Sequence, residues 1–423
     1  MAVQRHRMLG DLAARSDGSQ ADQDAAVVFD PDYFATFGAP YAALGRLRRD
    51  APVHPVDLPG IEPRVWLCTS YDDVRAVSRD DDLFASRFGN TLVAVEMLET
   101  SAMLPGIDPP RHTHYRKLIN RAFTPKKVAL LEAGIRQTAR SIVDDVLEKG
   151  EFDAVSDVSA AISLSVIADV MGVPRSDRHE IFRWSNAIGS LGIEDEDYAP
   201  DQATIGGAVH ELFGYCSDLV TRRRVEGLSD DILSSLLAAE VDGEGLTGDQ
   251  LNEFFLLLSV AGNETTRNTL SHAILALSEH PDQRAALAAD SSLIPGAVEE
   301  MLRWATPVLH FRRTVMAPTE LSGQQLDEGD WVVVHYLSAN RDDAVFNRAA
   351  EFDIVRKDAV KHVAFGGGGT HFCLGAQLAK LEMRVMLEEL YGRLPNLEVI
   401  AAPARLRSSF FHGIKRLPCS IAG

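Results

Sequence analysis

The sequence predicts a mainly α-helical protein with a minor β part, an α+β fold in a single domain. Long segments repeat apolar residues at helical spacing, whereas apolar stretches suited to strands are few and short. No internal repeat and no Gly/Ser-rich or Pro-rich linker divides the 423 residues. Because 46% of the residues are hydrophobic, the chain can bury a large core without disulfides or metals.

The first elements follow a polar start. Residues 1–28 are rich in Ala, Asp and Gln, and we expect a flexible leader there, in front of one domain over residues 29–423. Short apolar stretches at residues 53–56 and 64–67 flank Pro59-Gly60, which predicts a hairpin. A further strand is expected at residues 331–336 after Gly329-Asp330, and helical spacing occurs at residues 128–147, 158–170, 210–224 and 295–304.

The best-marked helix opens at Thr247, which forms a capping box with Gln250, and we expect it to run to Glu279. Its middle reads A-G-N-E-T-T over residues 261–266. Glycine alone costs a helix about 1 kcal/mol there, so function rather than helix stability accounts for these residues. The alternative is a simple bend in which threonine hydroxyls bond back to carbonyls one turn earlier.

Charge and cysteine usage exclude several classes of protein. The net charge of −19 argues against nucleic-acid and anionic membrane partners. Four cysteines far apart, with no C-x-x-C pair, favour a reducing compartment and argue against a zinc knuckle. No apolar run approaches the roughly 18 residues that span a bilayer, so we expect a cytoplasmic protein.

A glycine-rich string carries the strongest chemical signal. Residues 364–375 read A-F-G-G-G-G-T-H-F-C-L-G and precede a helix that stops near Gly392. The string fits neither a P-loop nor G-x-G-x-x-G. Cys373 stands at a helix start, where free N–H groups lower a thiol's pKa, so it is a nucleophile or a metal ligand. The competing interpretation is an inert buried thiol.

This string resembles the haem-thiolate signature of the bacterial cytochrome P450 family. Three further motifs follow the family's order: D-P-P-R-H at 108–112 with Arg116, A-G-N-E-T-T at 261–266, and E-x-x-R at 300–303. The resemblance implies a P450 fold that holds haem b between a long distal helix and a proximal Cys-loop helix. One departure is that Phe365 precedes Cys373 by eight residues rather than the usual seven.

The resemblance also implies roles for individual residues. Cys373 would be the axial iron ligand, whose thiolate favours O–O cleavage. Glu264 and Thr265 would deliver protons to dioxygen. The other implied haem contacts are Phe365, Gly366, Ala261 and Gly262, with His112, Arg116, Arg313 and His371 as propionate partners. Glu300, Arg303 and Arg356 would form a buried ion-pair cluster that braces the Cys loop.

The implied activity is insertion of one oxygen atom from dioxygen into a C–H bond of a bulky apolar molecule. The resemblance is to members that hydroxylate sterol side chains and methyl-branched lipids, so a steroid, terpenoid or branched lipid is expected. The predicted apolar pocket wall comprises Val93, Val95, Leu257, Val260, Ala261, Val308, Leu309, Phe410 and Phe411. A haem-thiolate peroxygenase or isomerase, and a non-catalytic helical binding protein, are the alternatives.

Electrons would come from a ferredoxin and an NAD(P)H-fed ferredoxin reductase, because the chain has no room for a fused redox domain. The segment at residues 111–127 has no Asp or Glu and would attract an acidic ferredoxin. Its cations are Arg111, Arg116, Lys117, Arg121, Lys126 and Lys127, and Lys380 and Arg384 would extend the patch.

Overall fold

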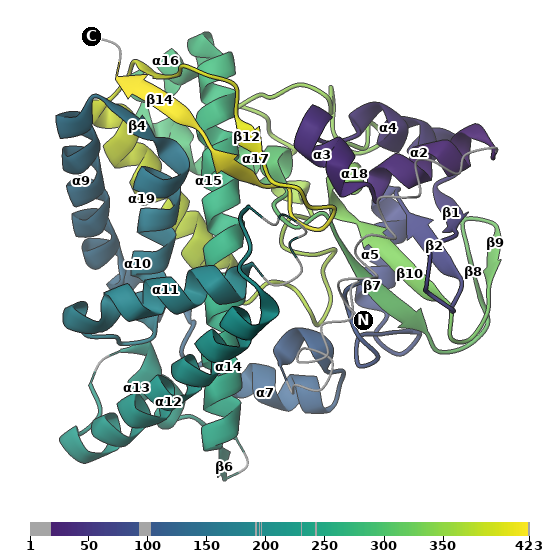
Figure 1. Cartoon of the computed structure of the whole chain (residues 1–423). Helices are drawn as coiled ribbons and strands as arrows, with labels where there is room; N and C mark the ends of the chain where they lie inside the picture. The colour runs from purple at the N-terminus through teal and green to yellow at the C-terminus, as the bar shows by residue number, and fades with distance from the viewer. Residues whose placement is uncertain are drawn as a thin grey trace.

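The computed structural model describes residues 18–92, 103–190, 193, 195, 197–229, 231–241 and 243–421. A large helical part lies beside a smaller sheet part (Figure 1), which confirms the predicted mainly α fold with a minor β part. The α-helices are α2 (Gln20–Val28), α3 (Pro31–Phe37), α4 (Tyr41–Asp50), α5 (Tyr71–Arg79), α7 (Arg111–Asn120), α8 (Pro125–Leu130), α9 (Glu132–Lys149), α10 (Ala161–Val170), α11 (Arg178–Gly189), α12 (Gln202–Glu226), α13 (Ile232–Leu237), α14 (Gly248–Ala261), α15 (Asn263–Glu279), α16 (Pro281–Ala289), α17 (Ile294–Ala305), α18 (Tyr336–Ala339) and α19 (Ala376–Arg393).

The main sheet has five strands in the order β1-β2-β10-β7-β3, and its two faces pack against different helices. On one face Val65, Leu67 and Val333 pack with residues of α2 and α4, and on the other Trp66 and Val332 pack with α5. This alternation is the period of two that a strand buried on both sides requires. The strands of this sheet are β1 (Val53–Val56), β2 (Val65–Cys68), β3 (Phe84–Ala85), β7 (His310–Val315) and β10 (Trp331–His335).

The predicted hairpin at residues 53–67 is β1 and β2, which pair antiparallel. The strand expected at 331–336 is β10, except that Tyr336 begins α18. It pairs antiparallel with β7 and parallel with β2. The remaining strands are β4 (Glu151–Asp153), β5 (Glu240–Val241), β6 (Glu244–Gly245), β8 (Thr319–Leu321), β9 (Gln324–Leu326), β11 (Leu397–Val399), β12 (Ala404–Arg405), β13 (Ile414–Arg416) and β14 (Pro418–Ile421).

The expected leader over residues 1–28 is wrong for its last part. Residues 1–17 lie outside the described residues, but Gln20–Val28 form α2, which opens with a capping box between Ser19 and Asp22. Val28 is fully buried in the core beneath the sheet. The polar composition is misleading because the Asp24 carboxylate is buried and lies 2.6 Å from a guanidinium nitrogen of Arg46.

The long helix expected from Thr247 to Glu279 is divided into α14 and α15, which stand one above the other in the helical part (Figure 1). The Thr247–Gln250 capping box is confirmed. Gly262 separates the two helices, and a Cβ there would lie only 3.1 Å from Ile167 Cγ1 of α10. The Thr265 hydroxyl donates to the Ala261 carbonyl at 2.6 Å, so the back-bonded bend considered as an alternative is present as well.

The other helices expected from periodicity are present with shifted ends. They correspond to α8 and α9, to a π-helical turn at Val155–Ala160 continued by α10, to α12 and to α17. Among the described residues no helix is long and apolar enough to cross a membrane.

Candidate active site

Cys373 lies in the loop between a 3₁₀ turn (Ala359–Lys361) and α19. Its backbone N–H donates to the Phe365 carbonyl at 2.9 Å, which closes the loop over residues 365–373. The N–H groups of Gly375 and Ala376 donate to its sulfur, and these bonds, with the charge of Arg116, lower the thiol's pKa. Burial raises the pKa by more, so the net shift is upward, and the predicted net lowering is wrong for the chain without a bound metal.

The four glycines of this loop fit against the end of α5. Gly366, Gly368 and Gly369 have φ values of 98°, 97° and 75°, a region that side chains rarely adopt. A Cβ on Gly367 would lie 2.5 Å from Ser78 Oγ, and one on Gly369 would lie 2.5 Å from the Ser78 carbonyl oxygen. The glycines therefore serve a tight loop and the close approach of α5.

The ion-pair cluster predicted from E-x-x-R is fully buried. Glu300 and Arg303 form two hydrogen bonds of 2.7 and 2.8 Å, and Arg356 Nε lies 3.2 Å from the same carboxylate. Arg303 also donates to the carbonyls of Asn340, Ala349 and Glu351 at 2.8, 2.9 and 3.0 Å. The cluster thus ties α17 to the segment that leads into the Cys loop.

Asn340 continues this connection, and no sequence motif marked it. Its side chain donates to the Thr306 hydroxyl at 2.8 Å and accepts from the Val363 N–H at 2.7 Å. Val363 stands directly before the glycine-rich string. An isolated asparagine at a helix end gives no signal, because its two side-chain partners, Thr306 and Val363, lie 34 and 23 residues away in the chain.

His112 and His371 lie together, as the resemblance implies. Their ring centroids are 4.5 Å apart, and His371 Nε2 lies 3.3 Å from the Ser86 hydroxyl. His112 is fully buried, and neither ring nitrogen has a hydrogen-bond partner among the described residues. Burial, followed by the neighbouring His371 and Arg116, lowers the pKa of His112 to about 4.

The two arginines predicted as propionate partners are placed differently. Arg116 lies on α7 and interacts electrostatically with Cys373, and its Nε donates to the Asn120 amide oxygen at 3.1 Å. Arg313 is buried on β7, and its one hydrogen bond among the described residues goes to the Arg312 carbonyl. The neighbouring Arg312 is occupied elsewhere, because it donates to the carbonyls of Phe88 and Thr91 at 2.7 Å.

These residues fit a haem. Cys373 would supply the thiolate ligand, and the ring nitrogens of His112, which have no partner among the described residues, match an acidic group of the cofactor. No carboxylate of the described residues pairs with Arg116 or Arg313, so both cations are available for propionates.

The predicted distal face is open in the middle of the helical part. Ala261 is exposed and Thr265 half-exposed, although both lie where α14 meets α15. They are four residues apart and so share one helix face. Leu257, Val260 and Val308 are also partly open.

Phe410 and Phe411 lie beside Val308, as the predicted pocket wall requires. Val308 and Phe411 form a β-bridge, and the two phenylalanine rings are 4.7 Å apart. The prediction that Leu309 lines this pocket wall is wrong, because Leu309 is fully buried in the core with Phe29. Adjacent residues of an extended chain point to opposite sides, so Val308 and Leu309 cannot both line one pocket. Val93 and Val95 lie outside the described residues.

Glu264 is buried and faces away from the open side. Its Oε1 accepts hydrogen bonds of 2.9 Å from the Tyr198 hydroxyl and from Arg267 Nη1. Its Oε2 has one long contact of 3.5 Å with the Asn268 amide. Thr265 was expected to act together with Glu264. Its hydroxyl donates instead to the Ala261 carbonyl, so the two side chains form separate contacts.

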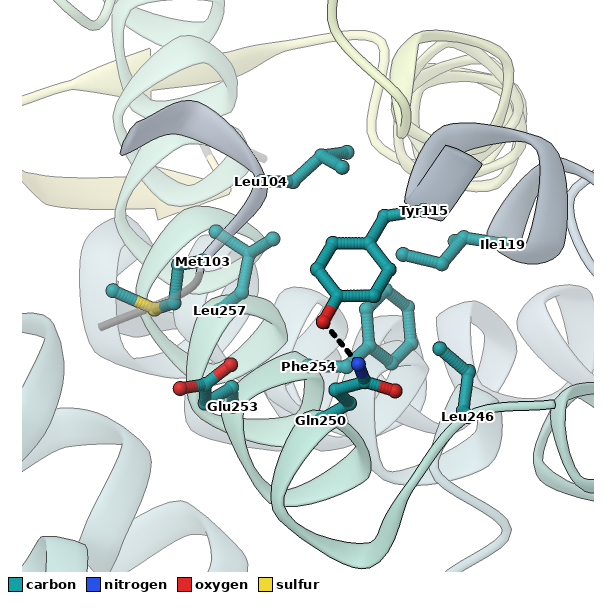
Figure 2. A pocket seen from close by; sticks show the side chains of 9 residues that line it. All are labelled: Met103, Leu104, Tyr115, Ile119, Leu246, Gln250, Glu253, Phe254 and Leu257. Atoms are coloured by element: carbon teal, nitrogen blue, oxygen red, sulfur yellow. Dashed lines mark hydrogen bonds between the residues drawn. The ribbon is translucent and has the colours of Figure 1, made fainter. Parts of the chain in front are cut away.

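A small pocket lies between α7 and the first half of α14 (Figure 2). The Gln250 amide donates to the Tyr115 hydroxyl at its polar end, and Leu257 lines its other end. Leu257 thus borders this pocket as well as the open face at Ala261. Most of the lining residues, such as Met103 and Phe254, were not predicted. The sequence does not distinguish an apolar residue that lines a pocket from one that packs in the core.

Comparisons with known proteins agree with this site. The family model described as Cytochrome P450 matches residues 199–394. A methyl-branched lipid omega-hydroxylase of Mycobacterium tuberculosis is 42% identical over 387 residues, covering 89% of this chain and 90% of the relative. A steroid C26-monooxygenase of Mycolicibacterium smegmatis is 37% identical over 398 residues, covering 91% of each chain.

Solved structures agree in fold. A Mycobacterium marinum cytochrome P450 in complex with pseudoionone has a TM-score of 0.84 at 36% identity, covering 92% of this chain and 97% of the other. CYP109E1 from Bacillus megaterium in complex with testosterone has a TM-score of 0.81 at 33% identity, covering 91% and 99%. The chain therefore belongs to the cytochrome P450 family, haem-thiolate monooxygenases that use haem b, dioxygen and redox partners to oxidise apolar substrates.

Proposed function

We propose that this enzyme hydroxylates an unactivated C–H bond of a bulky apolar molecule, and that a methyl-branched lipid or a steroid side chain is the preferred substrate class. The observation that carries the proposal is the set of partly exposed apolar side chains of the predicted site, Leu257 and Val260 on α14 and Val308 and Phe410 on a second cluster, which form the proposed apolar wall. Such a wall binds by buried area, at about 25 cal/mol per Å². The two relatives named above act on the same two classes.

Within the proposed site, Cys373 holds the iron and His112, Arg116, Arg313 and His371 bind the propionates. When bound, the haem supplies the oxygen chemistry, and the protein supplies orientation and protons. The Thr265 side chain is half-exposed, and its hydroxyl donates to the Ala261 carbonyl and would pass protons from there. Glu264 holds the next carboxylate along the same helix.

The substrate proposal is tested by spectral titration and product analysis with a methyl-branched fatty acid, a C27 steroid and a small polar acid. We expect tight binding and terminal hydroxylation of at least one of the first two. The variant Phe410→Ala should weaken that binding at least about fivefold, because it removes apolar contact area. Phe88→Ala, which changes a phenylalanine that is 53% exposed on the surface, should not. Tight binding of the polar acid alone would contradict the proposal.

Proton delivery is tested by Thr265→Ala. We expect unchanged substrate binding and less product per NADH, with the lost electrons recovered as peroxide, because only a hydroxyl is removed. Dependence on NADH rather than on added peroxide also separates a monooxygenase from the peroxygenase and isomerase alternatives. The non-catalytic alternative is contradicted by the family membership.

We further propose that a ferredoxin, reduced by an NAD(P)H-fed reductase, docks on α7 and α8. The structure reduces the expected basic patch. Lys380 lies 2.7 Å from Glu299, and Arg384 lies 2.8 Å from Glu132. These two cations are neutralised and cannot extend the patch as expected.

The exposed cations Lys117, Arg121 and Lys126 form no ion pair with a described residue, so they are available to an acidic partner. The double variant Arg121→Glu/Lys126→Glu should slow ferredoxin-driven reduction at low salt without changing substrate binding. The control Arg224→Glu reverses an exposed charge on α12 and should leave the rate unchanged. A reduction rate that changes neither with salt concentration nor in the double variant would show that the ferredoxin docks elsewhere. The cytoplasmic location stays a prediction.

A further inference from the structure

Tyr198 joins two parts of the proposed site that are otherwise separate. It lies in the connection between α11 and α12, among the described residues 197–201. Its hydroxyl donates to Glu264 Oε1 at 2.9 Å and accepts from Arg267 Nη1. Its side chain also packs against the buried cluster of Ile193, Leu406 and Phe411, on which Val308 and Phe410 pack as well. One residue thus contacts both the apolar wall and the buried carboxylate.

The position of Tyr198 is fixed from its own segment. Asp195, three residues earlier, is buried and lies 2.7 Å from Lys415 Nζ of β13. The Asp195 carbonyl accepts the backbone N–H groups of Tyr198 and Ala199 at 3.0 and 2.8 Å. The turn therefore anchors the backbone of Tyr198 to Asp195, which is itself tied to β13.

The two carboxylate oxygens of Glu264 differ in their hydrogen bonds. Oε1 has two strong donors, whereas Oε2 has only the 3.5 Å contact with the Asn268 amide. Hydrogen bonds to an ionised carboxylate are the strong ones, so Oε1 is held in place. Oε2 is the oxygen left with capacity to take up and release a proton.

We infer that Tyr198 is a positioning residue: its hydroxyl, with Arg267, fixes Oε1 of Glu264 so that Oε2 is the oxygen that passes the proton. This inference rests on the proposed proton-delivery role of Glu264. Arg267 Nη2 is held by Asn186 and Asn263, whereas its Nε has no partner among the described residues. Without the phenol hydroxyl, the guanidinium can therefore present Nε and Nη1 to both carboxylate oxygens, which occupies Oε2.

The test compares Tyr198→Phe, Glu264→Gln and the double variant in the holoenzyme with saturating substrate and a ferredoxin system. Tyr198→Phe keeps the ring, so we expect substrate binding within twofold of the wild type. Product per NADH should fall at least twofold, with a larger solvent deuterium isotope effect on NADH oxidation. The double variant should couple no worse than Glu264→Gln alone, since both changes act through one carboxylate.

A crystal structure of Tyr198→Phe gives a readout besides activity, and it should show both Glu264 oxygens on Arg267. The matched control is Tyr215→Phe, because the Tyr215 hydroxyl donates to Asp177 at 2.9 Å away from Glu264. Normal coupling in Tyr198→Phe beside poor coupling in Glu264→Gln would overturn the inference and leave the proposed function standing. Normal coupling in Glu264→Gln would overturn the proton role of Glu264, and the inference with it.

Discussion

The sulfur of Cys373 meets different surroundings from the other three thiols. Cys68, Cys216 and Cys419 are buried, and burial raises the pKa of each. Burial also raises the pKa of Cys373, but two backbone N–H groups and the charge of Arg116 counteract part of that shift. We expect Cys373→Ser to abolish the strongly red-shifted Soret band of the ferrous carbon-monoxide complex. The band should persist in Cys68→Ser and Cys419→Ser, and its loss in either would move the haem site.

Single residues also show what a sequence can predict. His112, Thr265 and Cys373 are identifiable because their chemistry requires one residue type at one spacing. The surroundings of Leu309 and Lys380 could not be predicted in this way. A leucine beside a pocket and a leucine in the core can have the same local sequence. The partner that neutralises Lys380, Glu299, is 81 residues away in the chain, so only the fold brings it close.

At the scale of an element, the Cys loop depends on its fit against α5. Gly369→Ala should destabilise the protein by about 1–3 kcal/mol and reduce haem content, because the new Cβ meets the Ser78 carbonyl oxygen and φ is 75°. Gly392→Ala is the matched control, since nothing lies within 4 Å of its Cβ position. Thermal unfolding and the haem-to-protein ratio measure both variants. A normal haem ratio in Gly369→Ala would show that the loop tolerates a shift.

The buried ion pair of α17 is a second element-scale feature. We expect Glu300→Gln to lower the free energy of unfolding by about 3–5 kcal/mol, because Arg303 and Arg356 would lose their buried countercharge. The control Glu351→Gln breaks an exposed pair of the same spacing with Arg348, and about 1 kcal/mol or less is expected. Urea titration distinguishes the two. Equal losses would mean that burial adds nothing to the pair.

The ends of an element were predictable where the apolar periodicity and a capping motif agree, as at Thr247–Gln250. They were not predictable where contacts with other parts of the chain determine where a helix ends. The break at Gly262 depends on Ile167, which lies on another helix. Likewise α2 contains a buried charge, Asp24, whose countercharge Arg46 lies on another helix.

At the scale of the whole molecule, four buried histidines besides His112 make the fold sensitive to acid. Burial lowers the pKa of His310 and His412 to about 4, and those of His272 and His335 well below 6.5. The unfolded chain takes up these protons below about pH 6.5, and the folded chain does not. Stability is therefore complete above that pH and is lost as pH falls toward 4, by up to about 1.4 kcal/mol per pH unit for each histidine.

Urea unfolding between pH 7.5 and 5 measures this slope. His310→Phe should make it shallower, since His310 has no hydrogen-bonded ring nitrogen among the described residues and lies against Phe29 and Phe410. His179→Gln, which changes a side chain that is 75% exposed, should leave the slope unchanged. An unchanged slope in His310→Phe would exclude that residue as a source of acid sensitivity.

The parallel pairing of β2 with β10 has a consequence for the synthesis of the protein on the ribosome. Val65 pairs with Trp331, so the second strand of the sheet lacks its neighbour until some 266 more residues have been made. At about 5–20 residues per second, that delay is roughly 13 to 53 s. During this time the β1–β2 hairpin emerges with an unpaired, apolar edge, which is a template for wrong association. The nascent N-terminal segment is therefore where we expect a chaperone to be needed.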